Sequence, residues 1–104
     1  MAGFVDDADQ SEHLAGILKA LAHPARLRIV AALREGPENV GALAARIGVE
    51  PAIVSQQLRI LRMGALVESE RSEGFALYRL AEPRLADLVL CLEKCPRKPK
   101  RRGR

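Results

Sequence analysis

The chain has very few aromatic residues and no long hydrophobic run. Its 104 residues include no tryptophan, one tyrosine and two phenylalanines. A core therefore has to be assembled from Leu, Ile, Val and Ala, which favours helices. No run of about 18 apolar residues is present, which excludes a transmembrane helix. The first residues are acidic and lack the basic segment of a signal peptide, so we expect a cytoplasmic protein, and the length predicts one domain.

Residue patterns that indicate catalysis are also scarce. We find no Ser/His/Asp set, no glycine-rich phosphate loop and no paired carboxylates at helical spacing beside an apolar pocket, so the sequence does not predict an enzyme. The two histidines, His13 and His23, have no second metal ligand nearby in the sequence. His23 directly precedes Pro24, which is more typical of the start of a helix than of a metal site. We therefore expect no required cofactor.

The charge of the chain is unevenly distributed. Seventeen basic residues stand against 13 acidic ones, but six of the basic residues lie in the last nine positions. The rest of the chain is therefore slightly acidic, and the alkaline isoelectric point is a property of the C-terminal segment. A basic arm of this kind either contacts nucleic acid or is a solubilising, disordered end.

Proline, asparagine and glycine mark the ends of several short amphipathic helices. Pro24 and Pro51 suit the first turn of a helix, Asn39 suits an N-cap, and Gly48 suits a helix end. Residues 66–71 and 75–80, separated by a short turn that contains Gly74, predict the two strands of a hairpin. The expected helices cover residues 11–22, 24–35, 40–47, 51–63 and 83–95, and the expected strands cover residues 66–71 and 75–80.

This order of elements predicts a mostly α fold with a small β-hairpin wing, the winged helix-turn-helix. The third helix, the turn Gly48-Val49-Glu50 and the fourth helix form its helix-turn-helix. We expect a disordered N-terminal segment at 1–10, a DNA-binding and dimerisation domain over 11–95, and a basic C-terminal tail at 96–104.

The helix expected at 51–63 has two different faces. Val54, Leu58 and Leu61 repeat at i, i+4 and i+7 and are expected to face the core. Polar and basic side chains repeat on another side, as on a recognition helix whose N-terminal end reaches base edges in the major groove. A basic residue beside the hairpin turn suits a wing that contacts phosphates. The predicted DNA-binding residues are Pro51, Ala52, Ser55, Gln56, Gln57, Arg59 and Arg62 on the helix and Arg71 on the wing.

Several motifs follow one another in an order that is typical of one known family. They are Leu21-Ala-His-Pro-Ala-Arg-Leu-Arg-Ile29, Val54-Ser-Gln-Gln-Leu-Arg-Ile-Leu61 and Gly64-Ala-Leu-Val67, followed by Arg71 and Tyr78-Arg-Leu80. In these motifs, and over about residues 11–95, the chain resembles the ArsR/SmtB family of bacterial repressors. The resemblance implies a homodimer held by the first and last helices and bound to an inverted-repeat operator on double-stranded DNA. It also implies release of the DNA by an inducer, often a metal or metalloid ion.

The chain departs from that family where many members bind their inducer. The stretch from Glu38 to Arg46, where many members carry a Cys-x-Cys-like ligand set, contains no Cys or His. Other members carry Asp-x-His and then His-x-x-Glu on the last helix, but the matching positions here are Glu82, Arg84, Cys95 and Lys98. Because two of these four side chains are cations, a zinc site of that type is not expected.

Cys91 and Cys95 are the remaining candidates for sensing. They lie four residues apart on the last expected helix, so their sulfur atoms share one face at the edge of its apolar stripe. If two copies pack this helix together, four thiols converge and could bind arsenite or a soft metal ion, or could be oxidised. The alternatives are a buried Cys91 beside an idle Cys95 at a fraying helix end, and an inducer that binds elsewhere.

The leading hypothesis is therefore a dimeric, DNA-binding transcriptional repressor that an inducer releases from its operator. The alternative is a winged-helix module that binds another protein through the same helix face, without sequence-specific DNA binding.

Overall fold

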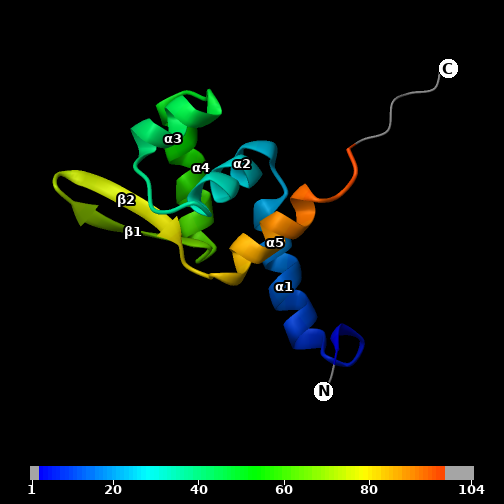
Figure 1. The fold of residues 1–104 in the computed structure, drawn as a ribbon. Helices are drawn as coiled ribbons and strands as arrows, with labels where there is room; N and C mark the ends of the chain where they lie inside the picture. The colour runs from blue at the N-terminus through cyan, green and yellow to red at the C-terminus, as the bar shows by residue number, and fades with distance from the viewer. Residues whose placement is uncertain (1–2, 98–104) are drawn as a thin grey trace, which may run out of the picture.

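A computed structural model, which describes residues 3–97, confirms the predicted order of elements (Figure 1). The helices are α1 (Ala8–Leu21), α2 (Pro24–Leu33), α3 (Val40–Ile47), α4 (Pro51–Met63) and α5 (Arg84–Glu93), and the strands are β1 (Val67–Ser72) and β2 (Phe75–Leu80). The hairpin projects from one side of the helical body, as expected for a wing (Figure 1). Within residues 3–97, no helix has the length and apolar character needed to cross a bilayer.

Local signals set the bounds of α3 and α4 as predicted. The Asn39 side chain accepts a hydrogen bond of 2.8 Å from the backbone N–H of Ala42, which caps the start of α3. Gly48 ends that helix in the left-handed conformation, with φ of 68°, which glycine adopts at little cost. Pro51 occupies the first position of α4. These signals lie within a few residues of each helix end, so the sequence alone was sufficient to place them.

The N-terminal segment is more ordered than expected. Phe4–Asp6 forms a turn of 3₁₀ helix, and α1 starts directly after Asp7. The Asp7 carboxylate accepts a hydrogen bond of 2.9 Å from the backbone N–H of Gln10 and so caps the helix. The expectation of disorder over 1–10 is therefore wrong for residues 4–10, because an acidic cap starts α1 before its hydrophobic repeat begins.

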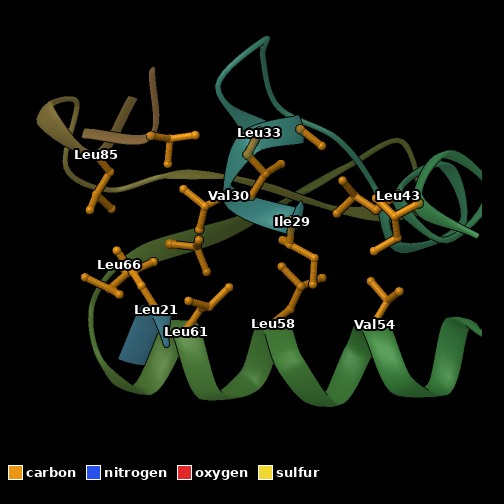
Figure 2. Packing of buried hydrophobic residues seen from close by; sticks show 14 of the residues in the cluster. Leu21, Ile29, Val30, Leu33, Leu43, Val54, Leu58, Leu61, Leu66 and Leu85 are labelled. Carbon is orange, nitrogen blue, oxygen red and sulfur yellow. The ribbon is translucent and has the colours of Figure 1, made fainter. Parts of the chain in front are cut away.

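One face of α4 packs against α2 and forms one side of the hydrophobic core. Figure 2 shows Val54, Leu58 and Leu61 pointing from this helix toward Ile29 and Val30 of α2. All five side chains are completely buried. The predicted core face of α4 is confirmed, and the opposite face of the helix is left free for contact with a ligand.

The hairpin is paired at its base and turns tightly at its tip. Its strands are antiparallel, in a register that pairs Val67 with Leu80 and Ser72 with Phe75. The two turn residues, Glu73 and Gly74, both have positive φ, which matches the twist of a two-residue hairpin loop. The base is also joined to the segment before α3, because Glu38 and Tyr78 exchange two backbone hydrogen bonds of 2.9 and 2.8 Å. The wing is therefore fixed relative to the helix-turn-helix.

Candidate nucleic-acid interface

The free face of α4 carries the predicted hydrogen-bonding stripe. Ser55, Gln56 and Arg59 are exposed, as are Pro51 and Ala52 at the start of the helix. Because Val54 and Leu58 alternate with these residues and are completely buried, the stripe lies on the face of α4 that points away from the core. Short polar side chains at the N-terminal end, followed by a guanidinium one turn later, can reach base edges and then a phosphate or guanine.

Arg62 connects the recognition helix to the wing. It is exposed in the last turn of α4, and its guanidinium donates a hydrogen bond of 3.2 Å from Nη1 to the Ser69 hydroxyl of β1. The predicted DNA contact of Arg62 therefore lies at the junction of α4 and the hairpin, where one guanidinium can serve both as a bridge and as a phosphate contact.

The wing leaves Arg71 exposed beside the turn, as predicted. Two of the glutamates that would repel phosphate are paired with Arg79, which donates from Nε to Glu68 at 3.0 Å and from Nη1 to Glu70. The hydrogen bonds to Glu68 and then to Glu70 raise the pKa of the Arg79 guanidinium above its usual value. One guanidinium thus offsets half of the negative charge of the two glutamates on β1.

Gln57 is not part of this exposed stripe, so the prediction that it contacts DNA is wrong. Its side chain is buried, with 9% of the residue exposed, and Oε1 accepts a hydrogen bond of 2.7 Å from Arg26 Nη1. On the helical wheel Gln57 lies at the boundary between the buried and the free face, so the pattern of α4 alone did not decide its orientation. The arginine of α2 that binds it was missed, because no local pattern links positions 31 residues apart.

The two cysteines are both exposed at the C-terminal end of α5. This helix ends at Glu93, two residues earlier than expected, so Cys95 lies in the turn that follows. Its backbone N–H still bonds to the Leu92 carbonyl at 3.0 Å, and its Sγ lies 4.0 Å from the Cys91 carbonyl oxygen. Both thiols therefore remain within one turn of each other and open to reagents. Within residues 3–97, no three His, Cys, Asp or Glu side chains are grouped to hold a metal ion.

An apolar groove of about 630 Å³ runs between α1 and the start of α5. Leu18 on its α1 side is 52% exposed, and Leu88 on its α5 side is half-buried. At the polar edge, the Arg84 guanidinium and backbone N–H bond to Glu82 and lower the pKa of its carboxyl to about 2. The lining residues are Phe4, Gln10, His13, Leu14, Ile17, Leu18, Glu82, Arg84, Leu85 and Leu88.

Comparisons with known proteins agree with this geometry. Residues 23–69 match the family model described as bacterial regulatory protein, arsR family. The chain is 40% identical over 87 residues to the biofilm growth-associated repressor of Xylella fastidiosa, a match that covers 84% of this chain and 76% of that protein. The crystal structure of the transcriptional repressor BigR from Xylella fastidiosa is similar with a TM-score of 0.81 and 37% identity, over 92% of this chain and 100% of that one.

A solution structure from Mycobacterium bovis gives a second structural comparison. It is the homodimeric winged helix-turn-helix DNA-binding domain of Mb0332, which is described as a possible ArsR-family transcriptional regulator. The similarity has a TM-score of 0.74 and 34% identity, and it covers 89% of this chain and 87% of that one.

Proposed function

This chain belongs to the ArsR family of bacterial regulatory proteins, and we propose that this DNA-binding transcriptional repressor holds an inverted-repeat operator as a homodimer. The observation that carries the proposal is the exposed stripe of Ser55, Gln56 and Arg59 on the face of α4 opposite the core. A DNA operator also implies that the protein works in the bacterial cytoplasm.

Within this proposal, each exposed residue of α4 has a distinct role. Gln56 pairs with an adenine edge and Ser55 accepts from or donates to a neighbouring base, since both side chains carry donor and acceptor groups. Arg59 holds a phosphate or a guanine. Pro51 and Ala52 are small enough to let the helix enter the major groove.

The wing supplies contacts to the DNA backbone. Arg71 is the exposed cation at its tip and suits a phosphate beside the groove that α4 enters. Arg62 fixes the angle between α4 and β1 through Ser69. We therefore assign positioning on the DNA to the wing and base recognition to α4.

The dimer forms through the groove between α1 and α5. Half of its lining residues are leucine or isoleucine, and a domain of this size has few other ways to cover such a surface. To bind an inverted repeat, a two-fold axis at this groove has to place the two copies of α4 at successive major grooves, about 34 Å apart. The inverted repeat follows from that symmetry.

Cys91 and Cys95 form the inducer site. Cys91 lies on α5, one turn after Leu88, which lines the groove, and Cys95 lies in the turn that follows the helix, so the four thiols of a dimer would approach one another. A soft metal ion would bind these sulfur atoms as thiolates and displace their protons, whereas arsenite, As(OH)₃, would form As–S bonds with the thiols and release one water for each bond. A persulfide donor would instead transfer its outer sulfur to one cysteine thiolate and leave as a thiol, and attack of a second cysteine thiol on this persulfide would form a disulfide and release hydrogen sulfide. Each of these changes alters packing at the dimer interface and so the spacing of the two recognition helices.

The test begins with a random-sequence duplex library, from which the wild-type protein recovers its operator. Recovery of an inverted repeat supports the proposal, whereas binding without any sequence preference would favour the alternative protein-interaction module. The complex is then titrated with arsenite, Cd²⁺, Zn²⁺, Cu⁺ and a persulfide donor, with the reduced protein as reference.

The double variant Cys91→Ser with Cys95→Ser identifies the sensing site. It should bind the operator as the wild type does, because neither thiol touches DNA in this proposal, and it should no longer be released by the active reagent. A coupling of about 3 kcal/mol corresponds to a release factor of about 150. Release of the double variant at the same reagent concentration would place the inducer site elsewhere.

A further inference from the structure

Arg26 joins three helices through one side chain. It lies on α2, and its Nε donates a hydrogen bond of 2.5 Å to the carbonyl of Ala20 in the last turn of α1. Its Nη1 donates a second hydrogen bond of 2.7 Å to Oε1 of Gln57 on α4. The Ala20 carbonyl is one of the four at the end of α1 that no helical N–H can reach, so this donor satisfies an otherwise free acceptor.

The bond to Gln57 differs in kind from the other contacts of α4 with the core. Val54, Leu58 and Leu61 pack through aliphatic contacts, which are non-directional and tolerate a small rotation or slide of the helix. Among residues 3–97, Arg26–Gln57 is the side-chain hydrogen bond that joins α4 to α2, and a planar guanidinium fixes both its direction and its length.

Gln57 directly follows the residues that face DNA. A rotation of α4 about its axis moves Gln57 and Gln56 together, so a bond that holds the first residue sets the direction of the second. We propose that Arg26 and Gln57 are positioning residues for DNA recognition, which hold Ser55 and Gln56 at the angle that fits the base edges. The same guanidinium ties α4 to the end of α1, the helix assigned to dimerisation. This inference rests on the proposed use of α4 to read bases.

The experiment compares two probes, the operator recovered from the random-sequence library and a scrambled duplex of the same composition. The variants are Arg26→Lys, which keeps the charge but cannot form the planar two-point contact, and Gln57→Leu, which keeps the approximate volume but removes the acceptor. Gln57→Glu keeps an acceptor at the same place and serves as the rescue. Arg28→Lys makes the same substitution on the exposed side of α2 and serves as the matched control.

We expect Arg26→Lys and Gln57→Leu to lose about 10- to 100-fold in affinity for the operator, the range that a hydrogen bond to a charged group represents. Affinity for the scrambled duplex should stay within about 3-fold, because phosphate contacts do not depend on the angle of α4 to the same degree. Gln57→Glu and Arg28→Lys should keep operator affinity. The base preference at the positions read by Ser55 and Gln56 should relax in the first two variants.

Two results would overturn the inference. One is wild-type operator affinity in both Arg26→Lys and Gln57→Leu. The other is an equal loss on both duplexes that follows a loss of thermal stability, which would mark the pair as structural only. If Gln57→Leu does not fold, Arg26→Lys carries the test. Ser55→Ala is measured in the same series, since an unchanged operator affinity in that variant would refute base reading by Ser55 itself and not the role of Arg26.

Discussion

Replacing Leu18 with Glu should separate the dimer into folded monomers. Leu18 is 52% exposed in the single chain, so about half of its side chain remains to be covered by a partner. Full burial of a leucine is worth about 1.5–3 kcal/mol, so covering the exposed half is worth about 1 kcal/mol. A two-fold interface buries the residue twice, which gives about 2 kcal/mol per dimer.

From this value, Leu18→Ala should raise the dimer dissociation constant about 30-fold. Leu18→Glu should raise it further, because a carboxylate enclosed in the groove loses its hydration without gaining a partner. The fold of the monomer should survive both changes, since Leu18 contributes little to the buried core. Sedimentation velocity over a range of concentrations measures the dissociation constant, and a gel shift on the selected operator measures binding.

The control is Leu90→Glu on α5. Leu90 is similarly exposed, at 45%, but does not line the groove, so this variant should remain dimeric. An unchanged dissociation constant for Leu18→Glu would place the interface elsewhere. Monomers that keep full operator affinity would refute the dimeric mode of binding.

Three further predictions test the DNA contacts and the edge of the groove. Gln56→Ala should weaken operator binding by about 1–3 kcal/mol and relax the preference for one base pair. Repeating the selection with the variant measures this preference. An unchanged preference would show that Gln56 does not contact a base. Truncation after Pro96 removes six basic residues, five of which lie beyond the described residues 3–97. It should lower the magnitude of the slope of log affinity against log salt concentration by about 0.9 for each phosphate that the tail neutralises. An unchanged slope would assign the tail to solubility. Because Arg84 lowers the folded-state pKa of Glu82 from 4.5 to about 2, the stabilising contribution of its carboxylate is complete above pH 4.5 and is lost as the pH falls toward 2. Glu82→Gln lacks this dependence, so its thermal stability should fall less between about pH 6 and about pH 3 than that of the wild type. An equal fall in the two proteins would contradict the assignment.

The parts of the fold that sequence reasoning placed correctly are those with local signals. The cap at Asn39, the left-handed Gly48 and the proline at the start of α4 each act within one helical turn, so the helix-turn-helix could be predicted almost to the residue. The start of α1 was missed because Asp7, an acidic residue in an acidic segment, gave no contrast with its neighbours. Its role as a cap depends on one hydrogen bond to Gln10.

The helical repeat of the sequence separates the buried face of α4 from its exposed face, and this part of the candidate site could be predicted. Ser55, Gln56 and Arg59 are on the free face, as the wheel predicted. Gln57 lies where the two faces meet, and its burial depends on Arg26, which is brought to it by the packing of α2 on α4. A contact between elements that are distant in the sequence leaves no periodic pattern, so the Arg26–Gln57 contact could be found only in the structure.

The pairing of Glu38 with Tyr78 makes the wing tip a replaceable part of the protein. The backbone bonds at the base of the hairpin and the Arg79 pairs along it hold the strands without help from the exposed turn beside Arg71. Substitutions beside that turn that keep Gly74 should therefore alter the affinity for the DNA backbone while leaving the folding energy nearly unchanged. For engineering, the tip is therefore the place where the strength of DNA binding could be tuned without redesign of the helical body.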